Sequence, residues 1–403
     1  MTELLAPAGN WPALRAAVEA GADAVYFGVK QLNMRITTEN FDIGEIKKIT
    51  EYCHESGVKA YLTLNVIIYD EELPIVKKII TTAKNANIDA IIAWDNAVLT
   101  ECKRQDIRIH LSTQASVSNY EAVKVYASLG VKRIILAREL SIPQIAFIKK
   151  QIKKDELDVE LETFVHGAMC VAISGRCFTS QFVFGKSANR GNCLQPCRRE
   201  YIVQDTDNEI TLKLGNNYVM SAKDLCALPF LNKLVEAEID AFKVEGRNKQ
   251  PEYVKTVVEV YREALNSIEK KKFDKKLVSK LMIKLRTVYN RDFSSGFFLG
   301  KPLPEHFADA YGSKQKMKKV FLGFVGNYYP KVGAAEIKLL TSGLKHGNWI
   351  MFQGKTTGVF EQVVSSMEIN NKKTKAAAKG ESVAIKVNRR VRKNDKVFLI
   401  SYS

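Results

Sequence analysis

The chain has 403 residues, enough for one domain of about 250–300 residues and a smaller second domain. Apolar residues make up 46% of it, so a large core can be buried and disorder through composition is excluded. The first residues lack the basic and apolar regions of a signal peptide, and no apolar run is long enough to span a membrane. We therefore expect a cytoplasmic protein with no membrane partner, whose cysteines are free, catalytic or metal-bound.

Eight short runs of apolar, β-favouring residues occur before residue 246, and each is followed by the pattern of an amphipathic helix. Parallel strands joined by helices give this alternation, and eight units favour a closed (β/α)₈ barrel of the TIM type. No G-x-G-x-x-G motif follows the first run, which argues against a dinucleotide-binding fold. The predicted strands are residues 3–6, 24–28, 60–65, 90–94, 109–114, 133–137, 160–166 and 240–245.

The regular spacing breaks after the seventh strand, where an insertion of about residues 167–235 is predicted. Long loops after barrel strands commonly carry function. We assign the α/β barrel to residues 1–300 and a linker to 301–319. Short strands with glycine or asparagine between them predict a small β-barrel domain over residues 320–403.

The predicted C-terminal domain is strongly basic. From Lys318 to Ser403 there are 16 Lys and Arg and 5 Asp and Glu, a net charge of +11 within a total of +17. A basic appendage on a nearly neutral body suggests a polyanionic partner, and we expect a nucleic acid. A solvated surface without a ligand is the alternative. The candidate cations for this contact are Lys372, Lys373, Arg389, Arg390 and Arg392.

Four of the seven cysteines open the insertion, at Cys170, Cys177, Cys193 and Cys197. Four thiolates can hold tetrahedral zinc or an iron–sulfur cluster. Structural zinc usually uses pairs two to four residues apart, and only the second pair has that spacing, so the pattern favours the cluster. Four buried cysteines without metal are the third interpretation.

The other three cysteines have different expected roles. Cys53 and Cys102 lie on predicted helices, where we expect them to be packing residues. Cys226 is a spare thiol that could replace a cluster ligand.

Polar residues follow several predicted strands at the end where TIM-barrel chemistry gathers. Arg35, Arg138 and Arg247 could clamp a carboxylate or a phosphate in bidentate fashion. Asn65 and Gln114 are further substrate-binding candidates, because they stand at the ends of the third and fifth strands.

Glu245 and His166 are the candidates for proton transfer, with Arg138 as the third catalytic candidate. The structural alternatives are an ion pair between Glu245 and Arg247, and a His166 that orients the cysteine segment. No Ser–His–Asp set, H-E-x-x-H motif or P-loop is present, so no motif favours hydrolysis.

The chain resembles the collagenase-like peptidase family U32 over about residues 1–300, and its C-terminal region resembles the C-terminal domain of that family. The segments that carry the resemblance are ELLAPAGN, ADAVYFG, LSTQAS, ILARELS, ETFVHGAMCVAISGRC, SANRGNCLQPCR and FKVEGR. The resemblance implies a 4Fe–4S cluster on Cys170, Cys177, Cys193 and Cys197. It also implies hydroxylation of a tRNA wobble uridine or a ribosomal RNA cytidine, with prephenate as a small carboxylate co-substrate.

A further branch of the family supports ubiquinone synthesis, but the C-x₃-C end and the extra β domain resemble the RNA branch. GKSANRGNCLQPCR resembles the ribosomal RNA group, whereas RDFSSGFFLG and the C-terminal domain resemble the tRNA group. We therefore expect 5-hydroxyuridine formation in tRNA, with the ribosomal RNA cytidine as the alternative. A collagenase-like peptidase and a non-catalytic RNA-binding protein are the competing functions.

Overall fold

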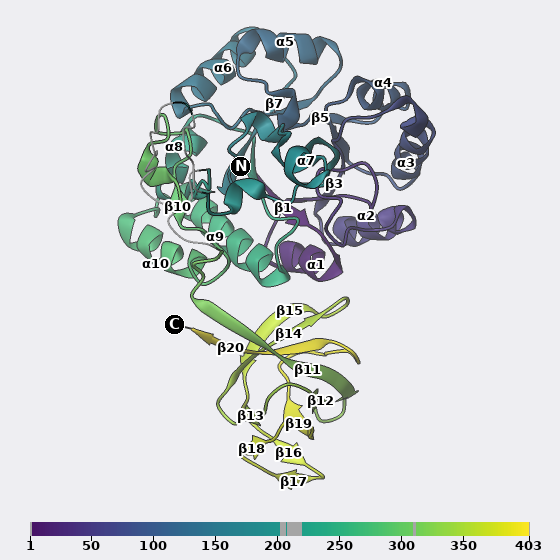
Figure 1. The fold of residues 1–403 in the computed structure, drawn as a ribbon, viewed down its shortest axis with the longest axis vertical. Coiled ribbons are helices and arrows are strands. Elements are labelled where there is room, and N and C mark those ends of the chain that lie inside the picture. Colours follow the sequence, from purple (N-terminus) through teal and green to yellow (C-terminus); the bar gives the residue numbers. More distant parts are fainter. Residues whose placement is uncertain (1, 202–206, 208–219, 309–311, 403) are drawn as a thin grey trace.

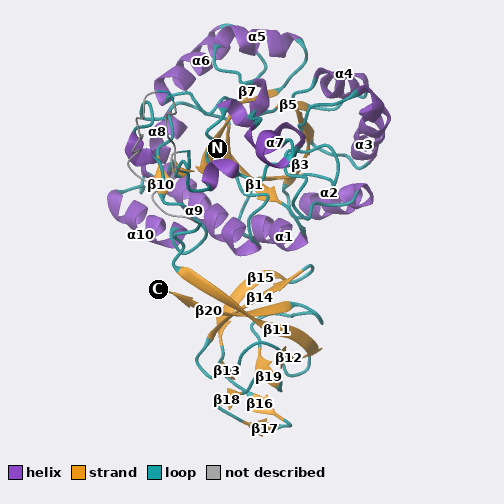
Figure 2. Cartoon of the chain, viewed as in Figure 1, coloured by secondary structure: helices purple, strands orange, loops and turns teal. Residues whose placement is uncertain are grey.

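The computed structural model describes residues 2–201, 207, 220–308 and 312–402. The chain forms a ring of helices around a barrel of strands, and a separate β domain lies beside the ring (Figure 1). Figure 2 shows that the helices surround the barrel, and that every described element from residue 317 onward is a strand.

Eight parallel strands close into the predicted barrel. Each strand pairs with the next in chain order, and the last strand pairs with both the seventh and the first. The barrel strands are β1 (Glu3–Ala8), β2 (Ala24–Phe27), β3 (Lys59–Leu64), β4 (Ala90–Ala93), β5 (Ile109–Leu111), β6 (Arg133–Ile135), β7 (Glu160–Gly167) and β9 (Ala241–Val244). The TIM-type fold predicted from the sequence is confirmed.

The strands are almost continuously apolar because one face packs inside the barrel and the other packs against helices. All four residues of β2 and of β4 are buried. One polar layer interrupts the interior, where the ammonium of Lys243 lies 2.8 Å from a carboxylate oxygen of Glu162. Both side chains are buried, so each charge needs the other.

The first helix begins close behind the first strand. The side chain of Asn10 accepts a hydrogen bond from the Ala13 N–H at 3.0 Å and caps the first helix. The helices around the barrel are α1 (Trp11–Glu19), α2 (Ile46–Glu55), α3 (Leu73–Asn85), α4 (Asn96–Arg104), α5 (Tyr120–Ser128), α6 (Ile142–Lys154), α8 (Leu231–Glu236), α9 (Pro251–Glu269) and α10 (Lys275–Leu285). Cys53 and Cys102 are buried on α2 and α4, as expected of packing residues. None of the described helices is long and apolar enough to cross a membrane.

The insertion after β7 carries the four cysteines on irregular chain and the short helix α7 (Thr179–Phe184). It returns to the barrel through β8 (Asp224–Cys226), which pairs antiparallel with the end of β7. On its other side β8 pairs with β10 (Phe293–Ser294). The sequence pattern predicted neither β8 nor β10, because strands of two or three residues have no measurable period.

The predicted linker over residues 301–319 is shorter in the structure. The Ala308 N–H donates to the carbonyl of Ser221 at 2.6 Å, so the chain still packs on the barrel there. The first strand of the C-terminal domain, β11 (Met317–Tyr329), begins inside the predicted linker. The first residues of the predicted linker therefore belong to the barrel domain, and its last residues belong to the β domain.

The C-terminal domain is an antiparallel sheet in the order β15-β14-β20-β11-β12-β19-β16-β17 around its own apolar core. The side chain of Gln362 donates to the carbonyl of Lys386 at 2.8 Å and links β15 to the end of β19, which curls the sheet toward a barrel. The remaining strands are β12 (Ala334–Leu339), β13 (Leu344–Lys345), β14 (Trp349–Gly354), β15 (Gly358–Val363), β16 (Glu368–Ile369), β17 (Lys372–Lys373), β18 (Ala376–Ala377), β19 (Ser382–Lys386) and β20 (Lys396–Tyr402).

The two domains pack against each other through α1 and the edge of the sheet. Ala16 of α1 is buried together with Met351 and Val359. Arg389 lies 2.8 Å from Glu19 across the same interface, so this arginine of the predicted RNA-binding set already has a partner.

Candidate functional site at the barrel mouth

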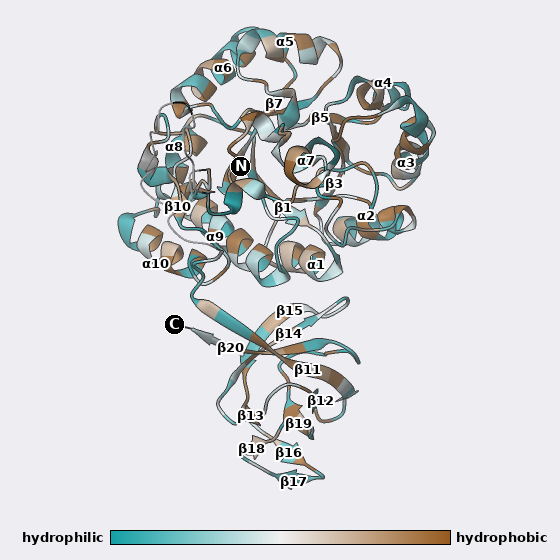
Figure 3. Cartoon of the chain, in the orientation of Figure 1, coloured by the Kyte–Doolittle hydropathy of each residue, from teal (hydrophilic) through white to brown (hydrophobic). Residues whose placement is uncertain are grey.

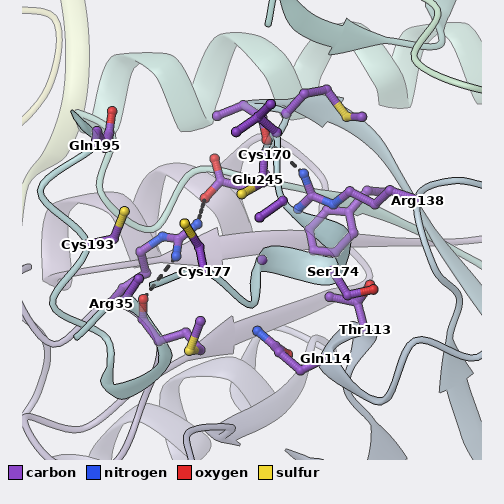
Figure 4. Close-up of a pocket in the computed structure, with 18 of the residues that line it drawn as sticks. Arg35, Thr113, Gln114, Arg138, Cys170, Ser174, Cys177, Cys193, Gln195 and Glu245 are labelled. Carbon is purple, nitrogen blue, oxygen red and sulfur yellow. Dashed lines mark hydrogen bonds and ion pairs between the residues drawn. The ribbon is translucent and has the colours of Figure 1, made fainter. Parts of the chain in front are cut away.

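A cavity of about 320 Å³ lies at the C-terminal ends of the barrel strands, beneath the cysteine insertion. Figure 4 shows residues from the strand ends and from the insertion converging on it. The cavity lining includes Arg35, Asn65, Gln114, Arg138, Glu245, Arg247, Cys170, Cys177, Cys193 and Cys197. Apart from His166, every site residue predicted from the sequence therefore faces one space.

The four cysteines of the insertion are free thiols around this cavity. Burial raises the pKa of the Cys197 thiol, Arg198 opposes that rise, and the charges of Cys170, Cys193 and Cys177 add to it. Among the residues described, no three Cys, His, Asp or Glu side chains lie close enough together to hold a single metal ion.

The four thiols are a donor set that either of the two expected metal groups takes. Four thiolates bind tetrahedral zinc at about 2.3 Å. Four thiolates also hold a 4Fe–4S cluster, which is a larger body and holds its thiolates farther apart.

Arginines and a glycine fix the insertion onto the barrel. Arg190 donates to Glu72 at 2.8 Å, and Arg176 donates to the hydroxyl of Ser116 at 2.9 Å. Gly191 has a φ of +86°, and a Cβ atom there would lie 2.2 Å from the carbonyl oxygen of Asn33. Only glycine fits this contact, so the backbone of the insertion lies directly on the loop after β2.

Glu245 is the buried acid of the cavity. Its Oε1 lies 3.1 Å from Nη2 of Arg35, whereas its buried Oε2 has no hydrogen-bond partner among the described atoms. Burial alone would raise the pKa of Glu245, but the charges of Arg35, Lys249 and Arg138 hold it below its ordinary value. The carboxylate is therefore ionised, and it pairs with Arg35 and not with Arg247 as the structural alternative supposed.

Arg138 and Arg247 are cations without an acidic partner in the described part of the chain. The guanidinium of Arg138 lies 3.8 Å over the ring of Phe164, and that of Arg247 donates to Thr63 at 2.8 Å and Asn33 at 3.0 Å. Burial lowers the pKa of Arg247 to about 10, so it stays protonated at neutral pH. Two arginines in one cavity, neither in an ion pair with a described carboxylate, favour an anionic ligand.

The opposite wall of the cavity is polar and neutral, apart from one acid. Asn65 and the hydroxyl of Ser112 both donate to Oε1 of Gln114, which turns the amide nitrogen of Gln114 toward the cavity (Figure 4). Oε2 of Glu139 and the hydroxyl of Ser174 are buried without partners among the described atoms. A ligand that donates hydrogen bonds would satisfy them.

His166 lies outside the cavity, where its ring packs against the rings of Tyr253, Tyr261 and Phe293. The pairing of β7 with β9 shifts register between Phe164 and His166, so Phe164 faces the cavity and His166 turns away. Burial lowers the pKa of His166 to about 3. A neutral, enclosed histidine does not fit proton transfer in the cavity.

Cys226 is also remote from the cavity, since it is buried beside the hydroxyl of Tyr261. It is therefore not placed to replace one of the four thiols. Ser174 and Arg291 also line the cavity, but no motif in the sequence identified them as site residues. Ser174 lies in the insertion, and Arg291 reaches the cavity from the segment after α10, where it pairs with Asp224 at 3.2 Å.

The chain matches the model of Peptidase family U32 over residues 9–308. It is 41% identical to an uncharacterized protease of Methanocaldococcus jannaschii, over 99% of this chain and 98% of that protein. It is 39% identical to a collagenase of Porphyromonas gingivalis, over 98% of this chain and 97% of that protein. It is 36% identical to tRNA hydroxylation protein P1 of Bacillus subtilis, over 81% of this chain and 77% of that protein. The family model covers most of the chain and these relatives confirm it, so the chain belongs to peptidase family U32.

Proposed function

We propose that this protein is an RNA-hydroxylating enzyme that forms 5-hydroxyuridine at a tRNA wobble position, and that it acts in the cytoplasm. The observation that carries the proposal is the barrel-mouth cavity, which brings arginines, a buried carboxylate and four thiols together. Its volume of about 320 Å³ is in the usual range for small-ligand sites. A relative named as a tRNA hydroxylation protein supports the same reaction class.

In this proposal Cys170, Cys177, Cys193 and Cys197 hold a 4Fe–4S cluster, with zinc as the less favoured occupant. A bound cluster would supply one-electron chemistry. With all four thiols engaged as ligands, no free thiol lines the cavity among the residues that the structure describes, and the remaining sulfur atoms there are the thioethers of Met34 and Met169. Thr179 N–H donates to the sulfur of Cys177 at 3.3 Å, the kind of contact that tunes a thiolate-bound cluster.

The remaining residues bind and orient the reactants. Arg138 and Arg247 fit a small dicarboxylate co-substrate such as prephenate, because each can offer a guanidinium edge to one carboxylate. The free Oε2 of Glu245 can accept a proton or a hydrogen bond from the base or from the co-substrate. Gln114 and Glu139 offer a donor and an acceptor to the polar edge of a pyrimidine.

Peptide hydrolysis is the second candidate, because two relatives that cover nearly the whole chain are named as a protease and a collagenase. The cavity gives it little support. No histidine is among the lining residues that the structure describes, so no Ser–His or Cys–His pair is formed there.

Nucleoside mass spectrometry of RNA from a deletion strain, with and without the restored gene, tests the proposal. We expect 5-hydroxyuridine to disappear from tRNA in the deletion strain and to return with the gene. Loss of a hydroxylated ribosomal RNA cytidine instead would identify the alternative substrate. Unchanged tRNA and ribosomal RNA, with gelatin cleavage by the purified protein, would replace the proposal with the peptidase.

A further inference from the structure

The cysteine insertion exposes an unusual amount of apolar surface. The side chain of Phe182 is 91% exposed and that of Phe178 is 71% exposed. The exposed patch consists of Val171, Ile173, Phe178, Phe182, Val183 and Leu194. Figure 3 shows the apolar colour of α7 over the barrel mouth. Apolar patches that stay exposed on a folded chain mark binding surfaces.

The patch borders the cavity, because Cys177 and Thr179, on either side of Phe178, line it. The N–H of Phe182 donates to the carbonyl of Phe178 at 2.9 Å, so the two rings leave the same side of one helical turn. Val171 and Ile173 are exposed and also line the cavity. A molecule that covers the patch would therefore lie at the cavity entrance.

The insertion that carries the aromatic rings is basic. Residues 170–201 contain five Lys and Arg and a single acid, Glu200. Arg176, Lys186 and Arg199 are exposed, and the Arg199 guanidinium lies 4.5 Å over the ring of Phe184. Aromatic faces beside cations are the chemistry that binds unpaired bases and their phosphates. An apolar protein partner would need the rings but not this charge.

We propose that Phe178 and Phe182 form a stacking platform for unpaired bases of an RNA loop, next to the base that enters the cavity. This inference rests on the proposed function, because it concerns how the substrate RNA reaches the same cavity. It specifies the substrate as a single-stranded loop whose flanking bases are unstacked. The platform recognises π faces and phosphates, so it needs no particular base.

The full-length holoprotein can be tested with an RNA hairpin that carries 2-aminopurine in its loop, and with a duplex of the same stem. We expect Phe182→Ala and Phe182→Leu to weaken hairpin binding by between about fivefold and a hundredfold, while Phe182→Tyr keeps it. Duplex binding should not change. Phe147→Ala is the matched control, because Phe147 is 59% exposed on α6, away from the patch.

Three outcomes would overturn the platform. Wild-type affinity in Phe182→Ala would show that RNA does not cover the patch, as would a wild-type protein that fails to bind the hairpin. Wild-type affinity in Phe182→Leu would show an apolar contact without stacking. A wild-type dimer that dissociates in Phe182→Ala, with unchanged hairpin binding, would assign the patch to a second copy of the chain.

The failure of this inference can be separated from the failure of the proposed function, because binding and hydroxylation are measured independently. Normal 5-hydroxyuridine in cells that carry Phe182→Ala, with unchanged hairpin affinity, would remove the platform and leave the enzyme. Hairpin binding that depends on Phe182, in a protein whose loss changes no modified nucleoside, would leave an RNA-binding protein without this activity.

Discussion

At the residue scale, the cysteines divide into thiols that face the cavity and thiols that pack in the core. Cys193 and Cys197 line the cavity, whereas Cys53 is fully buried on α2. Burial raises the pKa of Cys53 to about 12, so it is a poor thiolate ligand. The four thiols that line the cavity could be selected from the sequence because they fall close together in one segment.

Removal of one thiol tests the cofactor. We expect anaerobically purified protein to contain about four irons and four sulfides, and Cys193→Ala or Cys197→Ala to lose them. Cys53→Ala should retain the cofactor at the cost of a small cavity in the core. Iron and sulfide analysis checks both. Equimolar zinc without sulfide in the reconstituted wild type would exclude the cluster.

The lowered pKa of the buried His166 ring predicts how the stability of the protein depends on pH. The pKa of the ring is about 3 in the folded chain and near 6.5 when unfolded, so the unfolded chain binds one more proton between these values. The contribution of the neutral ring to the free energy of unfolding is fully present above pH 6.5. It falls as the pH drops toward 3, by up to about 1.4 kcal/mol per pH unit. Denaturant unfolding at pH 7 and pH 5 should show a smaller loss for His166→Phe than for the wild type. Equal losses would mean that the ring is protonated in the fold.

At the scale of elements, the sequence predicts the barrel well and the site in part. The eight strands were predictable because each is a buried apolar run between two helices. Arg35, Arg138 and Glu245 come at or after the C-terminal ends of strands, so the sequence also predicted that they would lie together at the barrel mouth. His166 could not be excluded in advance, because a register shift in the pairing of β7 with β9 leaves no trace in the residue pattern. Ion pairs between residues far apart in the sequence, such as Glu245 with Arg35, could not be predicted either, because they form only when the barrel closes.

The insertion itself offers a test of how it is held. Gly191→Ala would add a Cβ atom at 2.2 Å from the Asn33 carbonyl, at a φ of +86°. We expect faster proteolysis of the insertion and loss of the cofactor. Gly185→Ala is the matched control, because Gly185 has a φ of +64° and open space around its Cβ position, so strain of about 1–2 kcal/mol is its only cost. Equal behaviour of the two variants would show that the close contact is not needed.

At the scale of the whole molecule, the basic C-terminal domain is fixed to the barrel through α1. Truncation before residue 320 would cut β11 and expose the apolar interface of Ala16 with Met351, so it is a poor test of RNA binding. Exposed lysines of the domain are better probes. Lys372 and Lys373 are exposed on β17.

We expect the double change Lys372→Glu and Lys373→Glu to weaken RNA binding and to flatten its salt dependence, by roughly 0.7 in the slope of log K against log salt for each lost phosphate contact. Lys270→Glu with Lys271→Glu is the matched control, because these exposed lysines follow α9 on the barrel. Filter binding over a salt series measures both. An equal slope of log K against log salt in both variants would show that the RNA-binding surface is not on the β domain.

The cavity as a hydroxylation site is the central claim, and one measurement tests it most directly. Cells that lack the gene are complemented with wild type, Glu245→Gln or Arg138→Ala, and 5-hydroxyuridine is measured in their tRNA. We expect either variant to abolish the modification, because each removes a charge that faces the reactants, worth about 2–3 kcal/mol or more, while iron content and folding stay normal. Full 5-hydroxyuridine in both variants would contradict the account and place the chemistry elsewhere.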